Sequence, residues 1–141
     1  MEDTDLLREI LSTAKTVAVV GLGPKPDRPA YGVAEYLQDQ GYVIFPVNPG
    51  HAGKPILGRM TYASLADIPV GVDLVDIFRN PEAAAEVVDE AIRLKDEKGI
   101  RTVWMQVGIR HEEAAARARV AGLDVVMDKC TMTWHRRLLV R

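Results

Sequence analysis

Residues 16–31 read TVAVVGLGPKPDRPAY, a short run of mostly β-branched residues followed by a loop rich in glycine, proline and positive charge. The continuous run Thr16–Val20 is typical of a strand covered on both faces, as strands in a parallel sheet are. In doubly wound α/β sheets, ligands bind at the carboxyl ends of the strands. The stretch therefore predicts a buried first strand whose loop, residues 21–28, faces a binding site.

Further apolar runs alternate with helical patterns along the rest of the chain. The expected strands are Thr16–Val20, Tyr42–Val47, Asp73–Phe78, Thr102–Val107 and Leu123–Met127. The expected helices are Asp5–Ala14, Tyr31–Gln40, Pro81–Lys98, His111–Ala121 and Thr131–Leu139. This alternation predicts an α/β fold, a single Rossmann-like three-layer sandwich with a parallel sheet of about five strands. With the strands numbered along the chain, the expected order is 3-2-1-4-5.

The connection between the second and third strands has a different composition. Residues 46–69 contain four prolines and three glycines. They predict an irregular crossover with one short helix at Tyr62–Ala66, and long irregular crossovers often line a ligand site.

Composition narrows the classes of function. The chain has 141 residues, 48% hydrophobic and 27% charged, which predicts one domain over residues 1–141. The net charge of -2 gives no basic excess for a nucleic-acid partner. No apolar run reaches the ~20 residues of a membrane span, and the acidic N-terminus is unlike a signal peptide, so we expect a cytoplasmic protein. A homo-oligomer or a protein partner stays open.

The first loop predicts a phosphate site. Gly21 and Gly23, followed by Pro24, let backbone N–H groups approach phosphate oxygens, and Lys25 and Arg28 add positive charge. The same glycines alone are also compatible with a simple tight turn.

The second strand helps to choose among nucleotide cofactors. A NAD site requires a third glycine, where this chain has Pro26, and an acid after the second strand, where residues 45–51 read FPVNPGH. Basic residues follow instead, namely His51, Lys54 and Arg59, which suits a phosphorylated ribose. We therefore expect a nucleotide ligand with a phosphorylated ribose, and an NADP-dependent oxidoreductase is one alternative.

Residues at the ends of the third and fourth strands complete the candidate site. Phe78 is expected to pack on an adenine and Arg79 to meet a phosphate; the alternative is a buried Phe and a solvated Arg. Gln106 and Gly108 are expected to contact the ligand, or Gln106 caps a loop; with the coenzyme A that the resemblance described below implies, they would lie beside the pantetheine arm. Asp76 is expected to bond to neighbouring backbone.

The remaining reactive residue types give no catalytic constellation. The single cysteine, Cys130, excludes an internal disulfide; we expect a small buried residue, with a thiol activated by Lys129 as the alternative. His111 is expected at a helix cap and His135 at the surface or in a partner contact. Because the histidines are far apart, no metal site is expected. The pattern favours a binding protein over an enzyme.

The chain resembles a known family in five segments that occur in the family's order. These are residues 17–31 (VAVVGLGPKPDRPAY), 45–49 (FPVNP), 75–82 (VDIFRNPE), 103–108 (VWMQVG) and 126–130 (VMDKC). They are similar to the small stand-alone CoA-binding proteins, which resemble the CoA-binding domain of the succinyl-CoA synthetase alpha subunit.

The resemblance implies a CoA-binding Rossmann-like domain and assigns roles to these positions. Residues 21–28 would cradle the CoA phosphates, Asn48, Pro49 and the basic residues that follow would lie by the ribose phosphate, and residues 77–79 beside the nucleotide. Gly23 stands where many relatives carry a small hydroxyl or alanine. The synthetase also has a second domain with a phosphorylated histidine, which is not found here, so the resemblance implies binding of CoA or an acyl-CoA without ligase activity. A metabolite-sensing regulatory module, with residues 134–141 as its partner-binding segment, is the other alternative.

Overall fold

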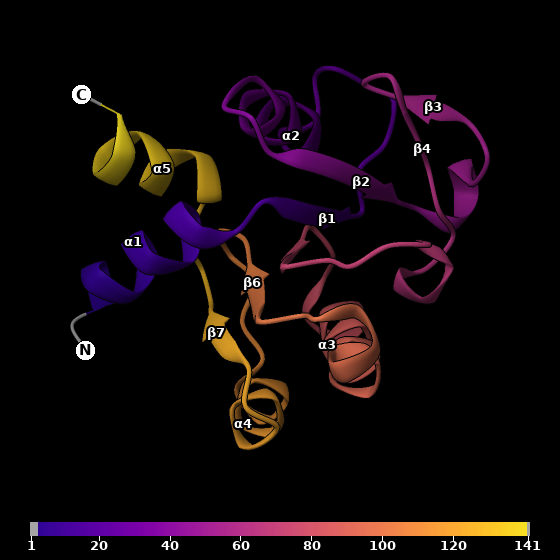
Figure 1. The fold of residues 1–141 in the computed structure, drawn as a ribbon. Helices are drawn as coiled ribbons and strands as arrows, with labels where there is room; N and C mark the ends of the chain where they lie inside the picture. Colours follow the sequence, from indigo (N-terminus) through magenta and orange to yellow (C-terminus); the bar gives the residue numbers. More distant parts are fainter. Residues whose placement is uncertain (1–2, 141) are drawn as a thin grey trace.

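The computed structural model, which describes residues 3–140, is built on a five-stranded parallel sheet (Figure 1). Its strands are β1 (Thr16–Val20), β2 (Val43–Val47), β5 (Leu74–Ile77), β6 (Thr102–Met105) and β7 (Asp124–Val126). The helices are α1 (Asp3–Thr13), α2 (Pro29–Asp39), α3 (Pro81–Lys98), α4 (Glu112–Val120) and α5 (Thr131–Leu139). The predicted α/β class and parallel sheet are confirmed, and α3 and α5 have the predicted bounds.

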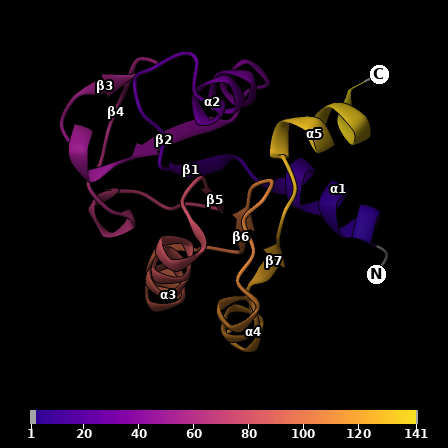
Figure 2. The ribbon, with the colours of Figure 1, turned by 180° about the vertical axis from the view of Figure 1, so that it is seen from behind.

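The strand order in the sheet is β2-β1-β5-β6-β7, so the predicted order 3-2-1-4-5 is wrong. Counted along the chain, the order is 2-1-3-4-5, with the third strand on the free side of β1. Figure 2 shows β5 between β1 and β6. Pro46 lies within β2 and has no N–H to donate to a second neighbour. Prolines are confined to edge strands for this reason, and β2 is indeed the edge.

Helices cover both faces of the sheet and define two apolar cores. Alternate residues of β1 enter different cores: Ala18 and Val20 pack in the core under α3 and α4, whereas Val17 and Val19 pack in the core under α1, α2 and α5. These four side chains are at most 4% exposed. Burial on both faces explains why the strand reads as a continuous apolar run.

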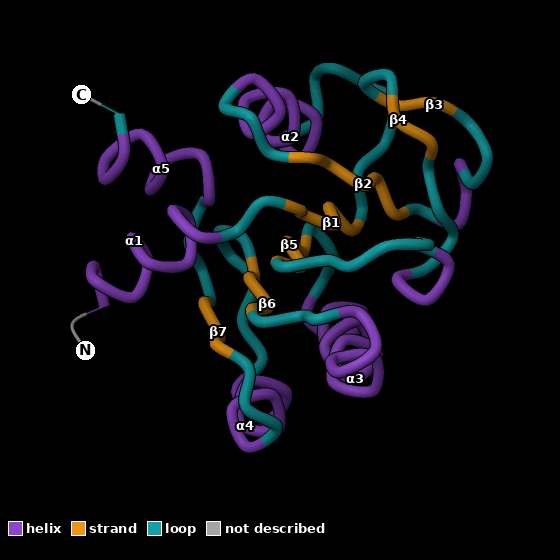
Figure 3. Tube along the Cα trace, viewed as in Figure 1, coloured by secondary structure: helices purple, strands orange, loops and turns teal. Residues whose placement is uncertain are grey.

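The crossover between β2 and β5 contains no long helix (Figure 3). It forms two 3-10 helices, Pro49–His51 and Leu65–Asp67, and a small hairpin of β3 (Pro55–Ile56) and β4 (Arg59–Met60). The short helix expected at Tyr62–Ala66 starts later, as the second of these 3-10 helices, and Tyr62 instead forms a bridge to Val47. The hairpin was not predicted. Its turn has positive φ at Leu57 and Gly58, as type I′ hairpin turns require at both central residues.

The last helix, α5, packs against α1 and α2, which corrects the prediction of an exposed His135. The His135 side chain is buried, and its Nδ1 lies 2.8 Å from the hydroxyl of Tyr36. The rings of Tyr36 and Tyr42 meet its imidazole edge-on, and burial lowers the pKa of His135. Trp134 is half-buried against the same core. This segment is therefore part of the fold; Arg141 lies outside the described residues.

None of the helices in residues 3–140 has the length and apolar content of a membrane span.

We predict that His135→Ala destabilises the domain by about 2–4 kcal/mol, because it removes a buried ring and a hydrogen bond. Thr133→Ala, an exposed position in the same helix, serves as the matched control and is expected within ~0.5 kcal/mol of wild type. Urea unfolding measures both. Equal stabilities for the two variants would contradict the observed packing of α5.

Candidate functional site

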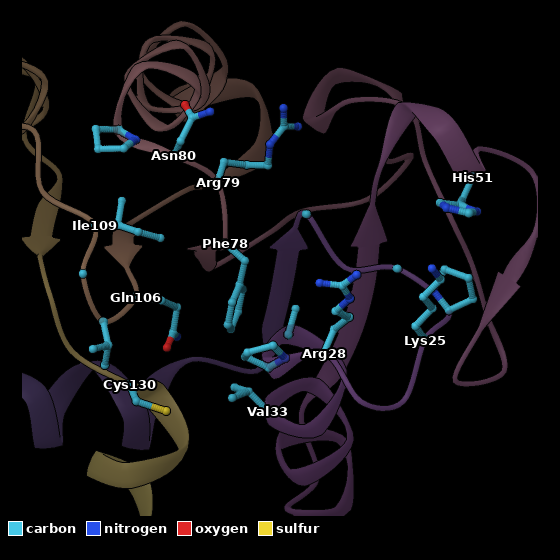
Figure 4. A pocket seen from close by; sticks show the side chains of 18 residues that line it. Lys25, Arg28, Val33, His51, Phe78, Arg79, Asn80, Gln106, Ile109 and Cys130 are labelled. Atoms are coloured by element: carbon cyan, nitrogen blue, oxygen red, sulfur yellow. The ribbon is translucent and has the colours of Figure 1, made fainter.

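A cavity of about 740 Å³ opens at the carboxyl edge of the sheet (Figure 4). Residues that follow β1, β5 and β6 line it, together with the first residues of α2 and α3 and Cys130 just before α5. A cavity at this edge agrees with the rule for doubly wound sheets, although the strand order differs from the one predicted.

Most of the sequence-predicted site residues meet at this cavity. Those that line it are Gly21, Gly23, Pro24, Lys25, Arg28, Phe78, Arg79, Gln106 and Gly108. Asn48, Pro49 and Lys54 do not. The Lys54 side chain is exposed, and from this part of the crossover it is His51 that borders the cavity.

The Asn48 side chain is hydrogen-bonded to the backbone of the first loop. Its amide Nδ2 donates to the carbonyl of Leu22 over 3.2 Å, and its Oδ1 accepts from the Gly50 N–H over 3.0 Å. The second contact caps the 3-10 helix Pro49–His51. Asn48 thus fixes the position of the loop without lining the cavity.

The two loop glycines have different physical roles. Gly21 has φ +98°, and a Cβ there would lie 2.5 Å from the carbonyl oxygen of Phe78. Only glycine fits this position, because the strained φ and the backbone clash act together. Gly23 has no positive φ, and a Cβ there would meet only Asn48 Nδ2, at 3.8 Å. Gly23 therefore leaves room for the small side chain that the resemblance implies in many relatives.

We predict that Gly21→Ala destabilises the domain by at least ~1–3 kcal/mol, the usual scale of backbone strain. Gly23→Ala is the matched control in the same loop and is expected to leave stability close to wild type. Thermal unfolding of the two variants measures the difference. A Gly21→Ala protein as stable as Gly23→Ala would show that the close approach to Phe78 is not required.

One side of the cavity is electropositive. Lys25, Arg28, His51 and Arg79 lie there, and no carboxylate lines the cavity within residues 3–140. In that part of the chain these four side chains form no ion pair. A polyanion would therefore meet the charges of Lys25, Arg28 and Arg79, which no ion pair neutralises in the described chain.

The N-termini of helices add further positive charge near the cavity. The N-termini of α2 and α3 border the cavity, and Cys130 precedes the N-terminus of α5. Asn80 caps α3 by accepting from the Ala83 N–H, whereas Arg28 and Cys130 give no side-chain cap. Helix N-termini carry a partial positive charge and free N–H groups, so they favour an anionic ligand.

The opposite side of the cavity is mainly apolar. Phe78 is half-buried, Val33 comes from the second turn of α2, and Val107 and Ile109 follow the end of β6. Sequence reasoning missed Val33 and Ile109; for Ile109 the available signal was its place just after a strand end. Cys130 is half-buried beside these residues. The N–H of Gly108 donates to Asp128 over 2.6 Å, so Gly108 shapes the wall without offering that donor.

A fully buried polar network lies behind Gln106. Asp76, in β5, accepts from Gln106 Nε2 over 2.6 Å and from the Thr131 hydroxyl over 2.9 Å. The prediction that Asp76 bonds to neighbouring backbone is therefore wrong. Burial raises the pKa of Asp76 to about 7, although both hydrogen bonds act to lower it.

Asp76 makes stability depend on pH. Its folded pKa lies above its unfolded value, so the folded state holds a proton that the unfolded state has lost between pH 4 and pH 7. Stability from this group is complete below pH 4 and is lost as pH rises through 7. We predict that wild type loses up to ~1.4 kcal/mol per pH unit relative to Asp76→Asn over this range. Urea unfolding at several pH values measures it; a constant difference would contradict the raised pKa.

The cavity has few side chains of the types that bind metals or transfer protons. Within residues 3–140, no three His, Cys, Asp or Glu side chains gather as metal ligands. Among the residues that the structure describes, the lining holds one thiol and one imidazole and has no carboxylate.

These features define a Rossmann-like α/β domain with a cationic ligand cavity at the carboxyl edge of its sheet. Over residues 15–136 the sequence matches the CoA binding domain family, and the chain belongs to this family. The resemblance drawn from the five sequence segments is thereby confirmed.

Two curated proteins illustrate the range of relatives. The uncharacterized protein YneT of Bacillus subtilis is 36% identical over 129 residues, which are 92% of this chain and 91% of that protein. The alpha subunit of the ADP-forming acetate–CoA ligase I of Pyrococcus furiosus is 32% identical over 99 residues. That match covers 67% of this chain and 21% of the subunit, and it relates the chain to the succinyl-CoA synthetase-like ligases.

Solved structures share the fold along nearly the whole chain. A hypothetical protein from Pyrococcus horikoshii has a TM-score of 0.89 and 40% identity, covering 98% of this chain and 93% of its own. A Thermus thermophilus protein has a TM-score of 0.90 and 41% identity, covering 98% of this chain and all of its own.

Proposed function

We propose that this protein binds coenzyme A or an acyl-CoA in the cavity at the carboxyl edge of the sheet. The observation that carries the proposal is the division of this cavity into a cationic side, without carboxylates among residues 3–140, and an apolar side (Figure 4). CoA has the same division, with phosphates at one end and the pantetheine arm at the other. Membership of the CoA binding domain family supports the choice of this ligand.

The phosphates would bind on the side of the first loop. Lys25 and Arg28 are exposed there, Arg79 projects from the end of β5, and α2 begins without a side-chain cap. Charge-assisted hydrogen bonds of this kind contribute ~1.5–3 kcal/mol each. His51 is the further basic group on this side, in place of Lys54.

The pantetheine arm would run along the apolar side. Phe78 offers a half-buried ring for the adenine, and Val33 and Ile109 border the space beyond it. The segment shared with the acetate–CoA ligase subunit is 21% of that subunit, so we propose binding alone and do not carry the ligase reaction over to this chain.

We predict that Lys25→Glu combined with Arg28→Glu weakens CoA binding by at least ~100-fold, because two charge-assisted contacts become repulsive. Both side chains are exposed on a loop, so the fold is expected to persist. Isothermal calorimetry with CoA measures the affinity, and circular dichroism checks the fold.

Lys54→Glu is the matched control, since Lys54 is an exposed cation of the crossover that does not line the cavity. Its affinity for CoA is expected to stay within a few-fold of wild type, the range of a screened surface charge. Equal loss in Lys54→Glu and the double variant would show that the phosphates lie elsewhere. Tighter binding of NADP than of CoA to wild type would overturn the proposed ligand.

A further inference from the structure

Gln106 is a buried polar side chain whose two ends face different surroundings. It follows β6, is 4% exposed, and borders the cavity between Phe78 and Cys130 (Figure 4). Its Nε2 donates to Asp76 Oδ1 over 2.6 Å and to Thr131 Oγ1 over 3.0 Å. Within residues 3–140, no protein group donates to its Oε1.

The chemistry of the network fixes which end of the carboxamide faces the cavity. Above its pKa of about 7, Asp76 is an ionised carboxylate that only accepts hydrogen bonds, so in that state it requires the N–H₂ end of Gln106. The Thr131 hydroxyl gives its single proton to Asp76 Oδ2 and accepts the second Gln106 proton on its oxygen. Both amide protons are then used, and the carbonyl oxygen remains for the cavity. A turned carboxamide would leave two buried acceptors opposed to each other.

Gln106 Oε1 is open to the cavity, so a ligand that covers it displaces water and must supply a donor of its own. An acceptor that becomes buried without a partner costs ~1–3 kcal/mol. The groups around Gln106 are apolar or weakly polar: Phe78, Ile109 and Cys130. The cations lie on the other side of the cavity, so the part of a CoA molecule that reaches Gln106 would be its uncharged arm. That arm contains two amide N–H donors.

We infer that Asp76 and Thr131 are positioning residues that hold Gln106 Oε1 as a fixed acceptor for an amide N–H of the pantetheine arm. The inference rests on the proposed function and deepens it. The phosphates supply most of the affinity, whereas Gln106 recognises the arm. Adenosine 3′,5′-bisphosphate, which has phosphates and adenine but no pantetheine arm, would not contact Gln106.

The experiment compares Thr131→Val with Thr131→Ser, using calorimetry with CoA and with adenosine 3′,5′-bisphosphate. The valine is nearly isosteric but frees one proton of the Gln106 amide, so CoA binding is expected to weaken about tenfold. The serine keeps the hydroxyl and is expected to restore the affinity. Neither change should move the affinity for adenosine 3′,5′-bisphosphate. Thr133→Val, an exposed position of α5, controls for the loss of a threonine.

Gln106→Met gives a second, independent reading if Thr131→Val does not fold. Methionine fills similar space without an acceptor, so CoA is expected to bind about tenfold more weakly and adenosine 3′,5′-bisphosphate unchanged. Acetyl-CoA lacks the S–H donor, and we expect it to lose as much affinity as CoA. A loss seen with CoA alone would make the thiol the donor and overturn the amide assignment.

The remaining outcomes separate the inference from the proposed function. Equal loss for CoA and adenosine 3′,5′-bisphosphate would mean that the network is only structural. Unchanged CoA binding in Gln106→Met would overturn the inference while the proposed function stands. Wild-type protein that binds neither compound would overturn the proposed function itself.

Discussion

The contact between Gly21 and the end of β5 is the constraint on which the site depends. The Phe78 N–H donates to Val20 over 2.8 Å, and the Gly21 N–H donates to Val47 over 2.9 Å. Three strand ends are thus tied together at one glycine, with the Phe78 carbonyl where a Cβ would otherwise be. Because the first loop leaves the sheet at this point, its cations line the same cavity as Phe78 and Arg79.

The arrangement also explains how one cavity has two chemically distinct sides. The cations Lys25, Arg28 and Arg79 come from the segments that leave β1 and β5, and they are exposed and without ion pairs in the described chain. The apolar wall comes from α2, the segment after β6 and the residue before α5. The two sides share only the segment after β5, which supplies Phe78 and Arg79, and α2, which begins after Arg28 and supplies Val33. A ligand with charge at one end and an uncharged arm at the other matches this geometry.

The sequence contained most of the local structure but little of the long-range pairing. Strand and helix positions follow from apolar periodicity and caps, so α3, with Asn80 before it and Gly99 after it, was predicted with its observed bounds. The strand order depends on where a helix-free crossover returns, and of the local signals only Pro46 indicated an edge strand. That His51 and not Lys54 lines the cavity depends on the 3-10 helix that Asn48 caps. The burial of His135 depends on two tyrosines distant in the sequence.

Asp76 shows why the centre of the site could not be deduced from residue types alone. In sequence it is one polar residue in an apolar strand, and its meaning comes from Gln106 and Thr131, which lie 30 and 55 positions away. Its burial disfavours the charged form and raises its pKa, so the ionised carboxylate costs stability at neutral pH and above. The carboxylate accepts hydrogen bonds from the Gln106 amide and the Thr131 hydroxyl. The Gln106 carbonyl oxygen then remains as an acceptor at the wall of the cavity. The buried carboxylate lowers stability, and the same group determines which end of the Gln106 carboxamide faces the cavity.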